Sequence, residues 1–245
     1  EVGLNKVESI EDAENAAESL RELWKLGVGP IGALTGCLED RGVRVFKLTS
    51  VPRFDGLSCL MNDRVPVIAY SADIPGDRQR FTMAHELGHL ILDVADVLDK
   101  EKAANRFAGA LLLPRATLLT KLGRSRSQLS LQELSLLKQK YGLSMQSISR
   151  RAHELGIIDE KTYKTIRQLF RRNGWTEREP GDQIASEQPR RYSLLLLQAM
   201  AERLITPSTA ADLTSYNPAK RPEVKTDSLV RAVESMVSDY RNDKE

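Results

Sequence analysis

The sequence predicts an α+β fold, with a small sheet and a helix pair in the first half and a mainly helical second half. Three short β-like runs lie between residues 43 and 70, and capped helical runs dominate from residue 73 onward. The 245 residues are 41% hydrophobic and 29% charged, which is typical of a soluble globular chain with a buried core. No apolar run approaches the roughly 20 residues that a membrane-spanning helix needs.

The first elements are two helices and the sheet. Residues 11–26 are rich in Ala, Glu and Leu and precede Gly27, which favours a helix that ends there. Pro30 lies near the start of a second helix, which runs to about residue 40. Turn residues then separate the β-like runs 43–46, 57–61 and 65–70.

Two consecutive helices follow the sheet. Asp73 and Pro75 are typical of a helix cap and a first helical turn, and they predict a helix that continues to about residue 93. A second helix is predicted from about residue 99 to residue 113, where Pro114 ends it. A chain reversal between them would make the two helices antiparallel neighbours.

The second half is predicted as further helices to about residue 173, a loose polar stretch over residues 174–189 that is a linker or a long surface segment, and a helical tail. In the tail, residues 192–213 and an amphipathic run near the end have helical spacing. We therefore expect three domains, over residues 1–120, 121–175 and 176–245. Since the chain begins with Glu1 rather than Met, we also expect that a segment preceding it is missing.

Cysteine usage and the absence of a secretory segment predict a cytoplasmic protein. Cys37 and Cys59 form no CxxC pair, and no basic-then-apolar run opens the chain. The formal net charge is only +2, but residues 115–172 hold thirteen bases and four acids. This local excess of positive charge could meet a polyanion, although a solvated helical face has the same composition.

The chemistry is concentrated in His85-Glu86-Leu87-Gly88-His89. Side chains four residues apart lie on one face of a helix, so His85 and His89 can hold one metal ion from the same side. Glu86 is offset by about 100° and can act as general base on a metal-bound water. The spacing predicts a hydrolytic zinc centre.

A catalytic zinc commonly has a third protein ligand and one open position. No further histidine lies close by, so a carboxylate must serve, and the candidates are Asp93, Asp96, Asp99 and Glu101. An antiparallel partner helix could direct Glu101 back at the imidazoles, which places Glu101 first and Asp99 second. Mn²⁺ or Fe²⁺ could also occupy such a site.

Two segments resemble the ImmA/IrrE family of zinc metallopeptidases: residues 78–89, which contain the HExxH motif, and residues 101–108, an ExxANxFA motif. The resemblance extends over about residues 15–215. It implies a zincin-like fold, with Glu101 as third zinc ligand, His85 and His89 as the other two, and Glu86 as catalytic base.

The resemblance also implies a regulatory endopeptidase. Such proteins cleave a specific partner, typically a helix-turn-helix (XRE-type) repressor or an antitoxin, in stress, phage or mobile-element, or toxin–antitoxin control. The alternatives are a DNA-binding transcriptional regulator and a zinc-binding interaction protein without proteolytic turnover. Self-association into a homo-oligomer stays open, and a membrane partner is not expected.

Some residues are candidates for supporting roles. Asn105 lies one helical turn after Glu101 and could orient the ligand carboxylate. Gly88 could permit a close approach of backbone or substrate beside the metal. The run Val67, Ile68, Ala69 and Tyr70 could form an edge strand that pairs with an extended substrate, or an internal strand.

The DNA-binding alternative rests on residues 132–158. Tyr141-Gly142-Leu143-Ser144 separates two helical runs with helix-turn-helix spacing, and Ser144 is a natural cap. Gln146, Ser149, Arg150 and Arg151 would then lie on or near the outer face of the second helix, where a recognition helix contacts DNA. The same geometry also occurs as ordinary packing in helical domains.

Overall fold

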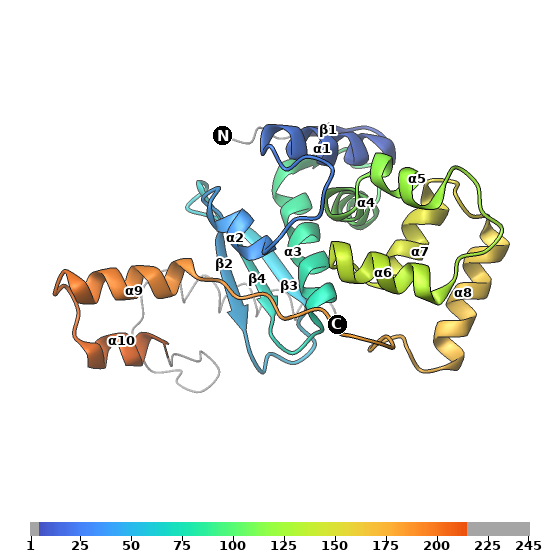
Figure 1. Cartoon of the computed structure of the whole chain (residues 1–245). Coiled ribbons are helices and arrows are strands. Elements are labelled where there is room, and N and C mark those ends of the chain that lie inside the picture. Colours follow the sequence, from blue (N-terminus) through green and yellow to red (C-terminus); the bar gives the residue numbers. More distant parts are fainter. Residues whose placement is uncertain (1–4, 215–245) are drawn as a thin grey trace. The chain divides into compact units, whose positions relative to one another are not determined.

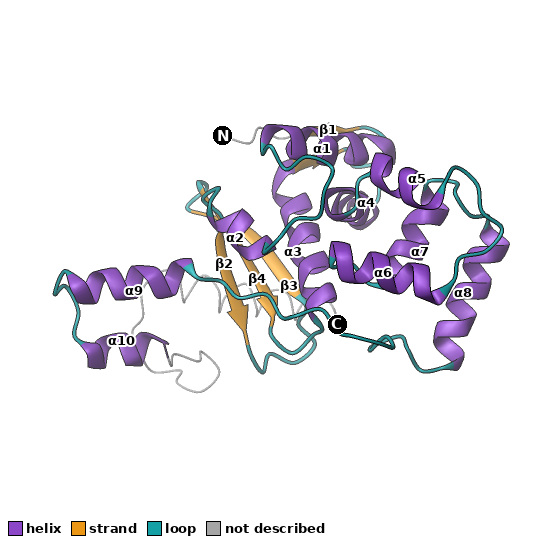
Figure 2. Ribbon diagram, viewed as in Figure 1, coloured by secondary structure: helices purple, strands orange, loops and turns teal. Residues whose placement is uncertain are grey.

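The computed structural model describes residues 5–214, which form two compact units that alternate along the chain. One unit comprises the residues up to Gly32 together with Ile74–Glu187, and the other comprises Ala33–Asp73 with the residues from Gln188 on. Helices predominate over two small sheets, which confirms the α+β class (Figures 1 and 2). Between residues 5 and 214, no helix is both long and apolar enough to cross a membrane.

The second unit contains the three-stranded sheet. Its strands are β2 (Arg44–Leu48), β3 (Gly56–Met61) and β4 (Val65–Ser71), in the order β2-β4-β3. β4 pairs parallel with β2 and antiparallel with β3, so β4 is the middle strand. Helix α2 (Leu34–Glu39) packs against β2.

Two further helices of this unit, α9 (Arg191–Ala201) and α10 (Pro207–Thr214), form a hairpin in the predicted helical tail. The Thr206 hydroxyl accepts a hydrogen bond from the Thr209 N–H at the start of α10, as expected of a cap. The amphipathic run predicted near the end of the chain lies outside the described residues.

The first unit is built on α3 (Gly76–Ile91) and α4 (Lys100–Leu112), which pack against each other. Strand β5 (Leu92–Val94) follows α3 directly and pairs in parallel with β1 (Asn5–Val7). The sequence pattern did not indicate these three-residue strands. β5 lies in the connection between α3 and α4, and its pairing with β1 anchors that connection.

Five more helices complete the first unit. Helix α1 packs on α4, and α7 packs on both α6 and α8. The predicted turn at Gly142 and the predicted cap at Ser144 are both present: Gly142 has a positive φ of 65°, and the Ser144 side chain accepts from the Ser147 N–H. The helices are α1 (Ile10–Leu23), α5 (Arg115–Leu122), α6 (Leu131–Tyr141), α7 (Met145–Glu154) and α8 (Glu160–Arg172).

A buried ion-pair network joins α1, α4 and α7. The Glu14 carboxylate is fully buried and lies 2.6 Å from Arg106 Nε and 2.5 Å from Arg151 Nη2. Arg151 also donates to the Leu113 carbonyl at the end of α4. A buried charge is tolerated only when opposite charges and hydrogen bonds compensate its desolvation, so these contacts hold the helices together as a set.

Most of the polar stretch predicted over residues 174–189 belongs to the first unit, which extends to Glu187. Residues 176–187, which we call the strap, run across the start of α3, and Glu179 and Glu187 within them are each 6% exposed. Glu187 pairs with Arg80, which also donates to the carbonyls of Ile31 and Gly32. The strap passes so close to Gly76 that a Cβ there would collide with strap carbonyl oxygens.

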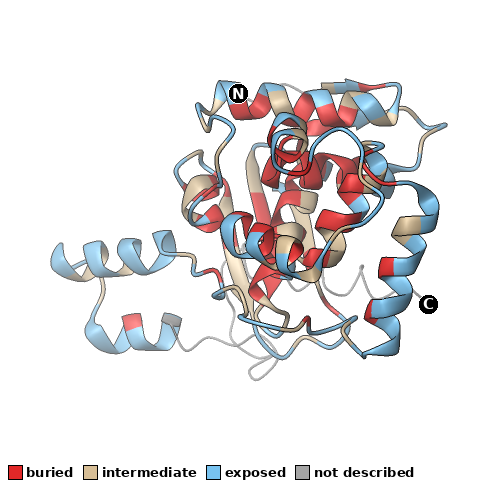
Figure 3. Cartoon of the chain, turned by 45° about the vertical axis from the view of Figure 1, so that its right-hand side comes forward, coloured by how far each residue is buried: buried red, intermediate tan, exposed pale blue. Residues whose placement is uncertain are grey.

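Residues 176–187 thus pack on the first unit, which composition alone could not indicate because it does not distinguish solvated polar residues from buried, paired ones. Figure 3 shows how the exposed and buried faces alternate along the helices. The predicted boundaries near residues 120 and 175 do not coincide with the two compact units, and the division into three domains stays a prediction.

Candidate metal centre

The site depends on how closely α3 and α4 approach. Gly88 lies at their contact, and a Cβ built on it would be 3.2 Å from Phe107 Cδ1 and 3.3 Å from Ala104 Cα. Gly88 follows His85 by three residues, and Ala104 follows Glu101 by three residues, so the two small residues lie about one turn from the ligand side chains. The expected close approach at Gly88 is thus between the helix backbones.

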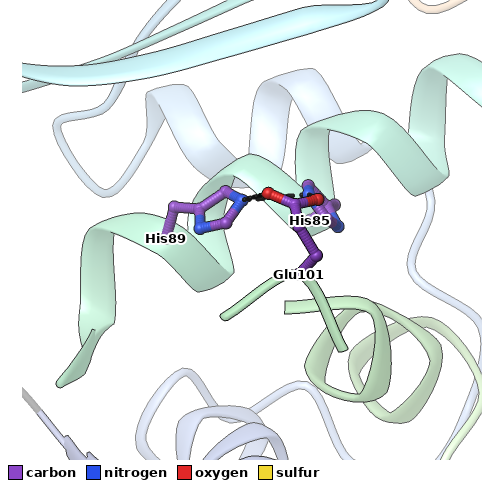
Figure 4. A group of neighbouring side chains, drawn as sticks. All are labelled: His85, His89 and Glu101. Carbon is purple, nitrogen blue, oxygen red and sulfur yellow. Dashed lines mark hydrogen bonds and ion pairs between the residues drawn. The ribbon is translucent and has the colours of Figure 1, made fainter. Parts of the chain in front are cut away.

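Three side chains converge at this contact, as Figure 4 shows. Glu101 Oε2 lies 3.2 Å from His85 Nε2, and Glu101 Oε1 lies 3.3 Å from His89 Nε2. The two Nε2 atoms are 3.0 Å apart. Glu101, the first-ranked carboxylate, therefore faces both imidazoles from the neighbouring helix.

The spacing of these atoms fits a metal ion. A tetrahedral zinc ion with bonds of about 2.0–2.1 Å holds its ligand atoms about 3.3 Å apart. His85, His89 and Glu101 each offer one ligand atom, and these atoms lie within 4.8 Å of one another. Glu101 and His89 are partly open to solvent, with side chains 70% and 30% exposed, so this group could hold a metal that a further molecule can reach.

Asn105 orients one imidazole rather than the carboxylate. Its Oδ1 lies 3.2 Å from His85 Nδ1. When the Nδ1–H of His85 donates to Asn105, the lone pair of the ring lies on Nε2, the atom that faces Glu101 and His89. Asn105 thus has a supporting place at the site, but its partner is His85 and not Glu101.

The electrostatic surroundings favour a neutral His85. Burial lowers the pKa of His85, and the adjacent His89 lowers it further, against the opposing effects of Glu101 and Asn105. A neutral imidazole is the form that binds metals.

The other carboxylates are elsewhere. Asp99, the second-ranked ligand, is the N-cap of α4, and its side chain accepts the Lys102 N–H at 3.1 Å. Asp93 is exposed on β5, and the Asp96 carboxylate is fully exposed, 4.0 Å from Lys100. Glu86 follows His85 on α3 and is half-buried.

The predicted substrate strand is not an edge. Val67, Ile68, Ala69 and Tyr70 lie in β4, the middle strand, and are paired on one side with β2 and on the other with β3. Because the backbone groups of a middle strand are used by both neighbours, these residues cannot add a substrate strand. Val67–Tyr70 as an edge strand was therefore wrong, and the internal alternative holds.

Two predicted outer-face residues of α7 are buried. Ser149 and Arg151 are each 1% exposed. The Arg151 guanidinium donates hydrogen bonds to the Glu14 carboxylate and the Leu113 carbonyl. Arg151 therefore cannot contact DNA, because its charge compensates a buried carboxylate. The Gln146 side chain donates to the carbonyls of Trp175 and Thr176.

Arg150 is the exposed arginine of the predicted DNA-contact set, with a half-exposed side chain that pairs with Glu154 Oε1 at 2.8 Å. A DNA contact by Arg150 stays a prediction.

Glu14 and Arg106 form a buried ion pair between α1 and α4 that was not predicted from the sequence. Arg106 follows Asn105 directly, and its side chain reaches Glu14 of α1 and, at 3.5 Å, Glu154 of α7. The signal available in the sequence was a charged residue among alanines in each helix: Glu14 lies beside Ala13 in α1, and Arg106 lies between Ala104 and Ala108 in α4.

Two comparisons with known proteins found similarity to this chain. Residues 38–153 match the family model for the IrrE N-terminal-like domain, the M78 peptidases. A solved structure named as a Mycobacterium tuberculosis transcriptional regulator is similar, with 18% sequence identity and a TM-score of 0.43. That match covers 58% of this chain and 46% of the regulator, so the chain spans less than half of the regulator's length. No curated protein matches the chain.

Proposed function

We propose that the chain, whose residues 38–153 match the IrrE N-terminal-like family model, is a zinc-dependent endopeptidase of the ImmA/IrrE type that acts on a specific protein partner. The convergence of His85, His89 and Glu101 carries the proposal, because three ligand atoms from two helices lie at zinc-like spacing and remain open to solvent. A non-catalytic structural zinc commonly has four protein ligands. Among the described residues the group contains three.

The residues around the site have separable tasks in this proposal. A zinc ion held there would supply Lewis-acid chemistry, polarising a peptide carbonyl and lowering the pKa of water. Asn105 keeps the His85 lone pair on Nε2, and Glu101 contributes negative charge from α4. Glu86 takes a proton from the attacking water and delivers it to the leaving amine.

The proposed substrate is a helix-turn-helix repressor or an antitoxin, whose cleavage would release genes under its control. Family membership supports this choice of substrate, while the exposed Glu101 supports access by a macromolecule. The stress and toxin–antitoxin contexts belong to the same proposal.

The first experiment is metal analysis of the purified chain after loading with zinc. Wild type should hold one zinc per chain, Glu101→Gln should hold much less, and Asp99→Asn should match wild type because Asp99 only caps α4. A wild-type chain that holds no stoichiometric metal after loading with zinc, manganese or iron would exclude the proposed centre.

The second experiment separates a protease from a metal-binding interaction protein. Zinc-loaded wild type and Glu86→Gln are incubated with a peptide library prepared from a cell extract, and new termini are identified by mass spectrometry. The protease should generate termini that are absent with Glu86→Gln, although both proteins bind zinc equally. Equal metal and no new termini with either protein would favour an interaction protein without turnover.

A further inference from the structure

A concave site lies near the metal centre and is lined in part by α3. It has a volume of about 260 Å³, and it lies between the start of α3, the start of α7 and the first residues of the strap. Its α3 lining includes Arg78 and Phe81, which precede His85 by seven and four residues. Residues at this spacing share one helix face, so the pocket and the ligand histidines lie along one line.

The pocket is close enough to hold part of the same substrate. The Phe81 and His85 ring centroids are 6.5 Å apart. An extended peptide advances about 3.3 Å per residue, so a chain with its scissile bond at the metal would reach the pocket about two residues away. A side chain that fills it would therefore set which bond lies over the metal.

Two of the three carboxylates at the pocket are already compensated. Asp77 and Glu179 lie 2.9 Å and 3.0 Å from the Nζ of Lys138, which is 1% exposed. Glu179 also accepts the backbone N–H groups of Met145 and Gln146 at the start of α7. These contacts are internal and leave little negative charge for a ligand.

Glu177 is the third carboxylate, and it differs from the other two. It is exposed at the pocket, and among the described residues it makes no hydrogen bond or ion pair. Since Lys138 already faces Asp77 and Glu179, Glu177 is the carboxylate available to a ligand at this pocket, and Arg78 is the cationic residue in the lining. The aromatic ring of Phe81 adds a surface on which a cation can rest.

We propose that this pocket is a specificity subsite that accepts a lysine or arginine side chain of the substrate about two residues from the scissile bond, with Glu177 as its counter-charge. The inference rests on the proposed peptidase function and names the substrate feature that the enzyme selects. Phe81 contacts the aliphatic stem of the basic side chain, and Glu177 pairs with its charged end.

The test compares cleavage preferences of zinc-loaded wild type, Glu177→Lys and Glu22→Lys on a random peptide library. Glu22 is a matched control, because it is an exposed glutamate of the same unit that does not line this pocket. Wild type and Glu22→Lys should prefer Lys or Arg at one position near the cut. In Glu177→Lys that preference should fall by roughly fivefold or reverse towards Asp and Glu.

A binding measurement keeps the inference testable if no peptide is cleaved. Trp175 directly precedes the strap and is one of two tryptophans, so its fluorescence is isolated in a Trp24→Phe background carrying Glu86→Gln. Acetyl-Lys-Arg-amide should bind more tightly than acetyl-Glu-Asp-amide, and Glu177→Lys should remove the difference.

The outcomes separate the two proposals. Cleavage with the same side-chain preference in wild type and Glu177→Lys would overturn the subsite and leave the peptidase intact. Absence of cleavage with retained, Glu177-dependent binding of the basic peptide would overturn the peptidase and keep the pocket as a site for basic side chains. Equal binding of both peptides would overturn the subsite without any turnover measurement.

Discussion

Gly88 lies against Ala104, and this contact sets the distance between the two metal-ligand helices. A Cβ on Gly88 would be 3.3 Å from the Ala104 Cα, which is tighter than an ordinary side-chain contact. Neither helix can move without moving a ligand, because His85 lies one turn before Gly88 and Glu101 lies one turn before Ala104. The metal centre is therefore as sensitive to packing as to the identity of its ligands.

Gly88→Ala should weaken metal binding although alanine favours helices. The added methyl forces α4 away by a few tenths of an ångström and moves Glu101, so the zinc affinity should fall on the order of tenfold, measured by competition with a chelator. Gly109→Ala is the matched control, since its Cβ would meet the nearest atom, Arg151 Cδ, at an ordinary 3.5 Å. Equal affinities for the two variants would contradict a spacing role for Gly88.

Asn105→Ala should lower zinc affinity by about 10–100-fold, because His85 loses the acceptor that holds its proton on Nδ1. Asn105→Asp should largely restore affinity, since a carboxylate accepts the same hydrogen bond. Lys102→Ala, an exposed substitution on the same helix, serves as control in the chelator competition. The orienting role fails if Asn105→Ala binds zinc as tightly as Lys102→Ala does.

Glu14 should make stability depend on pH. Burial alone would raise the pKa of Glu14, but the hydrogen bonds and charge of Arg151, with the charges of Arg106 and Arg115, lower it below its ordinary 4.5. As the pH falls below about 4.5, Glu14 therefore binds a proton more readily in the unfolded chain than in the folded one. The stability that Glu14 contributes above that pH is lost as the pH falls through the lower, folded-state pKa.

Urea unfolding between pH 3 and pH 7 tests this dependence. Glu14→Gln should lose roughly 3–5 kcal/mol at pH 7, because Arg151 remains buried without its counter-charge and Arg106 loses the nearest of its carboxylates. Its stability should also vary less with pH in the acid range. Glu22→Gln, at an exposed position of the same helix, should behave like wild type. An unchanged pH slope in Glu14→Gln would assign the acid sensitivity to other groups.

Gly142→Ala should destabilise the first unit more than Gly156→Ala. Both glycines have positive φ, 65° and 70°, so both substitutions carry a conformational cost of about 1–2 kcal/mol. At Gly142 the new Cβ would also collide with Arg80, whereas nothing lies within 4 Å at Gly156. Urea unfolding at pH 7 should show the larger loss for Gly142→Ala, and equal losses would mean that Arg80 moves aside freely.

The local parts of the site could be predicted from sequence. His85 and His89 are four residues apart on one helix, so periodicity alone places them together. The position of the third ligand depends on the chain reversal before α4. Residue order left four carboxylate candidates for that ligand, and the family resemblance implied Glu101. Asn105 was predicted at the site, but the choice between His85 and Glu101 as its partner depends on side-chain rotamers that no pattern encodes.

Features that depend on distant partners could not be predicted. Arg151 resembles a surface residue in sequence because its counter-charge, Glu14, lies 137 positions away. The place of β4 in the middle of the sheet depends on strand order, and alternation of side chains does not report strand order. The strap has the polar composition of a linker, and the sequence alone does not distinguish its buried glutamates from exposed ones.

The ion pairs around Glu14 also bear on where this domain can be cut. The family match begins at residue 38, after α1 has ended, and stops at residue 153, before the strap begins. A fragment trimmed to that match would keep Arg106 and Arg151 but lose Glu14, and it would leave Lys138 with one of its two buried carboxylates, Asp77, because Glu179 is lost. The family match is therefore shorter than the set of residues that compensates these buried charges, and a fragment that keeps the ion pairs should begin before Ser9 and continue past Glu187.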